Sequence, residues 1–415
     1  MRLAYVCADP GVPVFGTKGA SVHVQEILRA WRARGAEVRL YATRIGDDVP
    51  ADLADVPIVH VPVPAAVPTG PAPGRGARVA ARERAQAEAA QRIAERVVAD
   101  GADVVHERYS LFSIALADST STLGVPGILE VNAPLVDEQR THRDLVDEHA
   151  ARSALRTQVA AATRTACVSE PVARWVERSV SAAGGPAGRV VVAPNGVNVE
   201  RVGPCADSAA TGPDAGPPTV VFVGTLKPWH GVEHLLRART AAGTGWRLRV
   251  VGDGPQRASL ETLAAELGVE VEFTGAVAPT EVPARLADCA VAVAPYPATQ
   301  DAADQYFSPL KIYEYAAAAL PVVASRVGQV PAAVADGRTG VLVEPSDPAA
   351  LARAVDSLVA DPARRRAMGR AARRDAVARR SWTAVLDGIL AGTELAGTGS
   401  AVAGAEPAVP AGGRR

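Results

Sequence analysis

The chain is poor in aromatic residues and carries almost no net charge. Only 4% of its 415 residues are aromatic while 48% are hydrophobic, so its cores have to be built from Ala, Val and Leu rather than from rings. With Lys+Arg 44 against Asp+Glu 45, no global field would draw the chain to nucleic acid or to a membrane. We therefore expect no nucleic-acid partner, and any basic surface has to be local.

The few cysteines and the short apolar runs exclude further classes of protein. Cys7, Cys167, Cys205 and Cys289 lie far apart and form no C-x-x-C pair, which argues against a zinc site or a disulfide framework. The N-terminal apolar stretch is too short for a signal peptide, and no run approaches the ~18 apolar residues of a membrane span. We expect reduced thiols in a cytoplasmic protein that is soluble or at most peripheral on the inner membrane face.

Short β-branched segments alternate with longer Ala, Leu and Arg stretches of helical period. This alternation predicts βα repeats on parallel sheets. Residues 201–218 lack periodicity and are rich in Gly, Pro, Ala and Asp, so they are predicted to link two such series. The predicted strands are 3–9, 36–42, 102–108, 125–132, 165–169 and 189–196 in the first series, and 218–226, 246–254, 269–277, 289–297, 320–328 and 340–345 in the second.

The prediction is an α/β chain of two doubly wound, Rossmann-like domains. The Pro- and Gly-rich segment 62–77 is expected to be either a plain linker or a mobile loop over an active cleft. The predicted limits are 1–200 for the first domain, 201–218 for the linker, 219–375 for the second domain, 376–391 for a terminal helix that packs back on the first domain, and 392–415 for a disordered tail.

One string, SPLKIYEYAAAALPVVAS at residues 308–325, concentrates the signals of a ligand site. Its Ser-Pro start, helical stretch and closing strand place Lys311 and Glu314 near a helix N-terminus, where doubly wound sheets bind ligands. Free N–H groups and the charge of Lys311 suit phosphate, whereas the carboxylate of Glu314 suits a ribose diol. By spacing alone, ordinary capping charges remain the alternative interpretation.

This string resembles the donor-site signature of family 4 retaining glycosyltransferases. Their GT-B fold has two Rossmann-like domains that face each other, and the second domain binds a nucleotide-diphosphate sugar. The resemblance covers roughly residues 1–391 and rests on the order and spacing of these strings: the Gly16/Gly19 loop with HVQEILRAWRARGAEVRLYA, HERYSLF, LEVNAPLVDE, VSEPV, APNGVN, VGTLKPWHGVEHLL, VVGDGP and EFTGAV.

The resemblance implies a set of donor-binding residues. Glu314 corresponds to the family glutamate that holds the nucleotide ribose, and Tyr306 stands where the family has a glutamate that contacts the donor sugar. Asp304 or Gln305 is the alternative group for that sugar contact. The full implied donor set is Gly16 on the diphosphate, Val277 near the nucleobase, the backbone of 307–310 on the sugar and diphosphate, and the residues Thr225, Lys227, His230, Tyr306, Ser308, Leu310, Lys311 and Glu314.

The loop VGTLKPWHG differs from the family pattern in its charges. Thr225 and His230 stand where the family usually places an Arg and a Lys. Negative charge grows on the leaving diphosphate as the glycosidic bond breaks, so a nearby cation is required. Lys227 and Lys311 are the residues predicted to supply it.

Other nucleotide-binding patterns do not fit. Arg257 stands where a dinucleotide fingerprint needs its third small residue, and the run from Gly11 to Lys18 reads Gly-Thr-Lys rather than the Gly-Lys-Thr/Ser of a P-loop. The chain has no Asp-x-Asp pair, and His142 and His149 lack the spacing of metal ligands. We therefore expect no cofactor and no metal, with the nucleotide-diphosphate sugar as co-substrate.

Polar residues at strand ends of the first half are the predicted acceptor site. A residue that follows a strand is expected to project into the cleft, and a buried hydrogen-bonding role is the alternative for each. The predicted acceptor residues are His23, His106, Glu107, Arg108, Glu130 and Asn132, and the predicted catalytic residues are Lys227, Glu314 and His106.

An arginine-rich stretch at 364–380 is the one strongly basic segment that we expect to be a helix. Such a helix can dock on anionic lipid, which would suit a lipid-linked acceptor, and a solvated helix is the alternative. Small-molecule and glycan acceptors fit the sequence equally, and it sets no oligomeric state.

The function predicted from the resemblance is metal-independent transfer of a sugar from a nucleotide-diphosphate sugar to an acceptor hydroxyl, with retention. Two alternatives stay open. One is a sugar-nucleotide 2-epimerase, which shares the fold, and the other is a catalytically silent subunit that binds nucleotide sugars.

Overall fold

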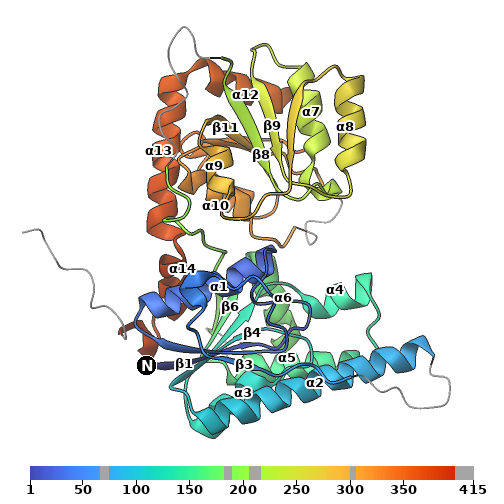
Figure 1. Ribbon diagram of the computed structural model, residues 1–415, viewed down its shortest axis with the longest axis vertical. Coiled ribbons are helices and arrows are strands. Elements are labelled where there is room, and N and C mark those ends of the chain that lie inside the picture. The colour runs from blue at the N-terminus through green and yellow to red at the C-terminus, as the bar shows by residue number, and fades with distance from the viewer. Residues whose placement is uncertain (66–73, 182–188, 205–215, 300–304, 398–415) are drawn as a thin grey trace, which may run out of the picture.

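The computed structural model describes residues 1–65, 74–181, 189–204, 216–299 and 305–397, and it contains two parallel sheets, one in each half of the chain (Figure 1). The predicted fold class is confirmed, since each sheet has helices on both faces in the manner of a Rossmann-like domain. Cys205 and the centre of the predicted linker lie outside the described residues, as does the middle half of the loop predicted at 62–77, residues 66–73.

The first sheet has seven strands in the order β3-β2-β1-β4-β5-β6-β7. Most of the residues in its central strands are buried, because helices cover both faces of a parallel sheet. The six predicted strands are all present, and β3, an edge strand of only three residues, is the one that the sequence pattern missed. The strands are β1 Arg2–Cys7, β2 Glu37–Ala42, β3 Ile58–His60, β4 Val104–Arg108, β5 Gly127–Val131, β6 Arg164–Cys167 and β7 Val190–Val192.

The second sheet has six strands in the order β10-β9-β8-β11-β12-β13. All six were predicted, since their Val- and Ala-rich runs are short and bounded by Gly or Pro. They are β8 Thr219–Val223, β9 Arg247–Val251, β10 Val271–Gly275, β11 Cys289–Ala294, β12 Val322–Ser325 and β13 Gly340–Val343.

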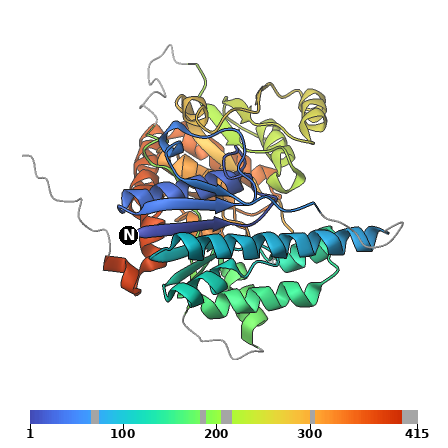
Figure 2. The same ribbon diagram turned by 60° about the horizontal axis from the view of Figure 1, so that its bottom comes forward.

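Helices cover both faces of each sheet. In the first domain α1 packs with α14 on one face, whereas α2, α3, α5 and α6 cover the opposite face, which Figure 2 turns toward the viewer. The helices are α1 Gly19–Ala33, α2 Arg75–Asp100, α3 Ala115–Leu123, α4 Leu135–His142, α5 Glu148–Ala161, α6 Glu170–Ser181, α7 Val232–Thr240, α8 Arg257–Glu266, α9 Val282–Leu286, α10 Leu310–Ala317, α11 Val330–Ala333, α12 Pro348–Ala360, α13 Pro362–Arg379 and α14 Trp382–Leu390, with 3-10 turns η1 Ala51–Leu53, η2 Pro228–His230 and η4 Glu394–Gly397.

The end of the chain returns to the first domain, but two predicted limits need correction. Helix α13 runs on to Arg379 because Ala376 is buried in the second domain, and α14 then starts at a new cap, Ser381. The apolar side of α14 joins the core around α1. The tail does not begin at 392, because Leu395 is buried and its carbonyl accepts a hydrogen bond of 3.2 Å from Arg34. The predicted loop also ends earlier than 77, since α2 begins at Arg75.

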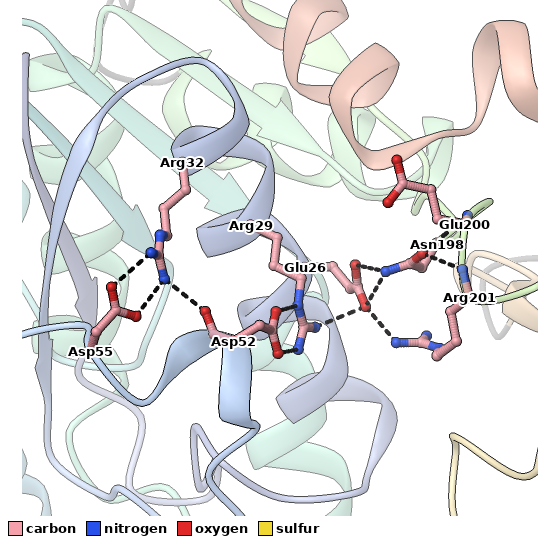
Figure 3. A network of polar contacts seen from close by, with 8 residues as sticks. All are labelled: Glu26, Arg29, Arg32, Asp52, Asp55, Asn198, Glu200 and Arg201. Atoms are coloured by element: carbon pink, nitrogen blue, oxygen red, sulfur yellow. Dashed lines mark hydrogen bonds and ion pairs between the residues drawn. The ribbon is translucent and has the colours of Figure 1, made fainter.

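A charged network joins the two domains where the chain crosses between them (Figure 3). The buried carboxylate of Glu26 on α1 accepts hydrogen bonds from Arg29 at 3.0 Å, from Arg201 at 2.7 Å and from Asn198 at 3.1 Å. Arg29 also pairs with Asp52 at 2.6 Å. The network lines a hollow of about 300 Å³ beside the start of α14. It holds residues 193–204, the described part of the chain that crosses from the first domain to the second, against α1. These residues are called the crossing segment below.

The arginines of α13 are only partly a surface feature. The buried Arg365 donates to the carbonyls of Leu358 and Val359 at 3.1 Å each, and Arg373 donates to three backbone carbonyls of the second domain and the crossing segment. Arg364, Arg370 and Arg374 are exposed. No helix in the described part of the chain is both long and apolar enough to span a membrane.

Candidate functional site

Helix α10 lies at the carboxyl end of the second sheet, where the signature string was predicted to act. Pro309 is the N-cap residue of α10, and its carbonyl accepts the N–H of Ile312 at 2.9 Å. The hydroxyl of Tyr315 accepts the N–H of Val223 at 2.8 Å and so docks α10 on the last residue of β8. The first turn of α10 is thereby held against the loop that follows β8.

Lys311 is a buried ammonium group on that first turn, only 8% exposed. Its Nζ lies 4.0 Å from the ring centre of Phe222 and 5.4 Å from that of Tyr296. Among the described residues this Nζ has no hydrogen bond and no ion pair. Burial lowers the pKa of Lys311 to about 7, an effect that the charge of Glu314 opposes.

The backbone beside Lys311 leaves room for its ammonium group. Gly224 has φ +148°, and a β-carbon added there would lie 2.8 Å from Lys311 Nζ. Only glycine fits this position without strain or a clash. The position of the Lys311 ammonium group therefore requires a glycine at the start of the loop after β8.

Glu314 lies one turn further along α10. Burial raises the pKa of its carboxyl group, and the charges of Arg201 and Lys311 act against that rise. In the described ranges no side chain or backbone group donates a hydrogen bond to the carboxylate of Glu314, whose backbone carbonyl accepts the N–H of Ala318 at 2.9 Å. Its carboxylate oxygens are thus available to a ligand hydroxyl, as the ribose assignment requires.

The loop from Gly224 to Gly231 joins β8 to α7 and holds three predicted donor residues. The ring of His230 turns back to the carbonyl of Thr225 through Nδ1. Burial lowers the pKa of His230 to about 4, and the charge of Lys311 adds to that effect. His230 is therefore neutral near pH 7 and does not replace a missing cation in this loop.

Lys227 is the cation of the same loop. Its Nζ lies 5.2 Å from the ring centre of Trp229, which is 55% exposed. Within the described residues Lys227 forms no ion pair. Its side chain is nearer to solvent than that of Lys311, and its predicted contact with an anion stays a prediction.

Two predicted donor residues connect the domains instead of facing solvent. The hydroxyl of Tyr306 donates to the carboxylate of Glu138 on α4, and Ser308 Oγ accepts the N–H of Asn195 at 3.1 Å. Of the alternatives for the sugar contact, Gln305 is buried and Asp304 lies outside the described residues.

The Gly-rich loop of the first domain approaches α10, and the predicted base contact packs on the core of the second domain. A methyl group on Gly19 would lie 3.5 Å from Leu310 Cδ1, so the N-termini of α1 and α10 meet across the domains. The carbonyl of Gly16 accepts a hydrogen bond of 3.0 Å from Gln25, which anchors this loop to α1. Val277, two residues after β10, packs on the apolar core of the second domain.

Glu130 is the centre of a buried polar cluster in the first domain. Its carboxylate contacts His23 Nε2, lies 3.3 Å from His106 Nε2 and accepts the amide of Asn132 at 2.9 Å. Burial alone would raise the pKa of Glu130, but His23 and His106 outweigh it and hold that pKa well below the usual range. His23 Nδ1 meets Asn195 Oδ1 at 2.8 Å, which links the cluster to the crossing segment.

His106 does not project out of the sheet, and that expectation is wrong. Strand β4 continues through Arg108, so His106 is a strand residue with a fully buried ring. The indole N–H of Trp31 donates to His106 Nδ1 at 2.9 Å. An indole only donates, so the ring proton of a neutral His106 is on Nε2, toward Glu130. His106 positions Glu130 and has no surface for a substrate.

Glu107 and Arg108 face different environments. The fully buried Glu107 accepts hydrogen bonds from Ser113 Oγ at 2.5 Å and Leu116 N at 2.6 Å, and burial raises its pKa to about 7. Glu107 therefore anchors the start of α3 and does not face a substrate. Arg108, the last residue of β4, has a buried Nη1 without a hydrogen-bond partner in the described part of the chain.

Several residues of the site were missed by sequence reasoning. They include Tyr315, Tyr296 and Trp31. Aromatic residues are rare in this chain, and their rarity is the sequence signal that could have pointed to these three. Asn195 and Glu138 lie inside strings that the resemblance already used, but their contacts need the folded chain. In the described ranges no three His, Cys, Asp or Glu side chains gather as metal ligands would.

Curated relatives match about half of the chain. A GDP-mannose-dependent alpha-(1-6)-phosphatidylinositol monomannoside mannosyltransferase of Mycolicibacterium smegmatis is 33% identical over 222 residues, 51% of this chain and 58% of that protein. A D-inositol 3-phosphate glycosyltransferase of Segniliparus rotundus is 36% identical over 225 residues, 52% of this chain and 49% of the relative. The chain thus spans about half the length of the curated relatives it matches.

Solved structures share the whole fold. A sucrose-phosphate synthase from Thermosynechococcus elongatus superposes with a TM-score of 0.64 at 23% identity, covering 92% of this chain and 96% of that one. Anabaena HepE, solved in complex with UDP, gives a TM-score of 0.66 at 17% identity, covering 94% of this chain and 98% of its own. At these identities the likeness establishes the two-domain GT-B architecture.

Family models match the two domains in turn. The model described as Glycosyltransferase Family 4 matches residues 17–201, and the model described as Glycosyl transferases group 1 matches residues 217–361. The matches follow each other along the chain, one on each sheet, with the donor string inside the second. The chain therefore belongs to the family 4, group 1 glycosyltransferases of the GT-B fold.

Proposed function

We propose that this protein is a retaining, metal-independent glycosyltransferase that moves a sugar from a nucleotide-diphosphate sugar to an acceptor hydroxyl. The observation that carries the proposal is the pair of charged side chains on α10 that form no hydrogen bond with the part of the chain that the structure describes. Lys311 and Glu314 lie one turn apart, next to the loop after β8 and opposite the N-terminus of α1. A cation for phosphate and a carboxylate for a ribose are the two groups that a nucleotide-diphosphate sugar needs.

Each group has a proposed role toward the donor. Glu314 accepts hydrogen bonds from the ribose, and main chain near Val277 contacts the base. Lys311 and Lys227 stabilise the diphosphate, where charge develops as the glycosidic bond breaks, and the Gly16 loop approaches it from the first domain. The acceptor attacks from the same face through an oxocarbenium-like ion pair, and the leaving phosphate takes its proton. No protein nucleophile is needed.

The acceptor is proposed to enter from the first domain. Arg108 and Asn132 lie at the carboxyl ends of adjacent strands, and Arg108 has unused donors. His106 and Glu107 support these strands from inside, so they contribute by positioning.

The donor and acceptor are best identified by a screen. The GDP-mannose-dependent relative and the UDP complex of HepE make GDP- and UDP-sugars the first donors to test. The names of the two curated relatives suggest phosphatidylinositol mannosides and inositol phosphates as acceptors. Thermal shift and hydrolysis with UDP-, GDP-, ADP- and TDP-sugars report binding and turnover together. NMR of the product anomer tests retention, and unchanged rates in EDTA test independence from metal.

Two substitutions test the site. Glu314→Ala and Lys227→Ala should each lower transfer by about tenfold or more, the ~1.4 kcal/mol scale of a lost charged contact. Arg174→Ala, which removes an exposed ion pair with Glu170 on α6, is the matched control and should leave transfer unchanged. Wild-type rates in both site variants would refute the assignment.

The alternatives give different products. A 2-epimerase would convert the nucleotide sugar, or release nucleotide, with no acceptor present. A silent subunit would bind nucleotide sugar without turnover under any acceptor. Transfer to one acceptor excludes both.

We also propose a cytoplasmic enzyme that contacts the inner membrane face through Arg364, Arg370 and Arg374 on α13, which are exposed. Flotation with anionic vesicles tests this contact. Charge reversal at these three positions should abolish flotation without changing transfer to a soluble acceptor, and flotation that persists would refute the contact.

A further inference from the structure

Lys311 combines three features that rarely occur together in a lysine. Its ammonium group is buried, it has no hydrogen bond or ion pair among the described residues, and it lies against two aromatic rings. Cation–π contacts with Phe222 and Tyr296 recover part of the lost hydration, but they supply no counter-charge.

The groups around Lys311 do not provide that counter-charge either. The titratable side chains packed near it in the described structure are His230 from the loop after β8, Tyr296 from the segment after β11, and Glu314 on its own helix. Burial lowers the pKa of His230 and raises the pKa of Tyr296, so both are neutral near pH 7. Glu314 is the one acidic neighbour, and no oxygen of it lies within 4.0 Å of Lys311 Nζ.

The position of Lys311 makes it an anion site. The ammonium group lies under Gly224, at the carboxyl end of β8, where ligands of doubly wound sheets bind. A diphosphate brought to this loop would place full negative charge beside an amine that is otherwise uncompensated. Such a charge favours the protonated amine strongly, because the buried surroundings of Lys311 leave little solvent to screen the attraction.

We propose that Lys311 couples donor binding to protonation: the empty site holds the amine partly neutral, and a bound nucleotide diphosphate makes it take up a proton from solvent. The inference rests on the proposed function, because it assumes that the donor diphosphate occupies this loop. It goes further by assigning the proton, and hence a pH dependence, to one side chain.

The direction of the pH effect follows from the burial. Because burial lowers the pKa of Lys311 to about 7, the empty protein loses its ammonium charge above that pH. The complex keeps the charge to higher pH. Affinity for the donor should therefore fall by up to about tenfold per pH unit above about pH 7, until the amine of the complex also deprotonates.

The test is titration calorimetry of the full chain with UDP-glucose, GDP-mannose, ADP-glucose and TDP-glucose. Their diphosphates are esterified at both ends and keep their charge across the pH range used, so they take up no proton themselves. Each titration is run at about pH 8 in two buffers of different ionisation enthalpy. The difference in apparent enthalpy gives the number of protons taken up, which we expect to approach one.

Three variants assign that proton. Lys311→Met keeps the length of the side chain and should bind more weakly with no proton uptake. Lys311→Arg carries a permanent charge and should bind without proton uptake and without the fall in affinity above pH 7. Lys227→Met should weaken binding but leave proton uptake intact, because the side chain of Lys227 is only partly buried.

The outcomes separate the inference from the proposed function. Binding by wild type without proton uptake overturns the inference and leaves the function standing. Uptake that persists in Lys311→Met but disappears in His230→Gln would assign the proton to His230 and also overturn it. If none of the four nucleotide sugars binds, both fall.

Discussion

Two of the buried charged residues that the structure describes, Glu130 in the first domain and Lys311 in the second, differ in what surrounds them. Glu130 has two histidines and an amide, and the cluster continues through Asn195 and Trp31. Lys311 has two aromatic faces and no partner of opposite charge within ion-pair distance.

The difference separates a structural centre from a ligand-binding centre. A charge compensated inside the protein stabilises the fold and has nothing left for a substrate, whereas an uncompensated buried charge costs stability and gains its partner only from a ligand. The sequence had placed both centres among the functional residues, Glu130 as a polar residue at a strand end and Lys311 as a cation near a helix N-terminus. The contacts tell them apart.

Glu130→Ala should have the largest effect on stability. It leaves His23 and His106 buried without their carboxylate, and breaking such a pair costs about 3–5 kcal/mol. Urea unfolding followed by circular dichroism measures the loss. Asp103→Ala, which removes an exposed pair with Arg2, is the control and should cost at most about 1 kcal/mol. Equal losses in the two variants would remove the distinction between the centres.

Lys311→Met should change stability in the opposite direction to Glu130→Ala. The folded state holds the pKa of Lys311 near 7, below its usual 10.5, so the unfolded chain binds the extra proton between these values and wild-type stability rises with pH there. The variant lacks that rise. Near pH 7 it should be more stable than wild type, by on the order of 2–4 kcal/mol, and the gap should close toward pH 10. A gap that stays constant with pH would show that the buried amine is already compensated.

Tyr306→Phe should have the smallest effect and tests the link between the two regions. It removes the hydroxyl contact with Glu138 across the domains, worth about 0.5–1.5 kcal/mol. Donor KM should change by less than about threefold, because the hydroxyl is engaged with α4 rather than a sugar. Steady-state kinetics and thermal unfolding check both numbers. A large rise in donor KM with unchanged stability would return Tyr306 to the sugar site.

Much of the fold could be predicted because its signals are local. The twelve predicted strands are all present, since a buried parallel strand is a short Val- and Ala-rich run between turns. β3 escaped because three residues at a sheet edge, Ile58–His60, give too short a pattern. The tail limit failed at Leu395, where two hydrogen bonds from Arg34 and packing on the first-domain core order residues that look disordered by composition.

The site could be predicted only as a set of residues. Lys311, Glu314, Lys227 and His230 are brought to the neighbourhood of one loop, as the string and the resemblance suggested. His106 and Glu107 lie inside the sheet, because β4 extends to Arg108 and a strand residue points into the core on one face or the other.

By itself, then, the sequence determined the class of fold, the positions of twelve strands along the chain and the string that is proposed to bind a nucleotide sugar, since periodicity and glycine spacing act over a few residues. The tertiary structure alone decided which charges are compensated. Burial and counter-charge depend on side chains that are distant in sequence: Glu130 contacts His23 and His106, while Lys311 lies against the rings of Phe222 and Tyr296. That is why one buried charge belongs to the fold and the other is left for a ligand.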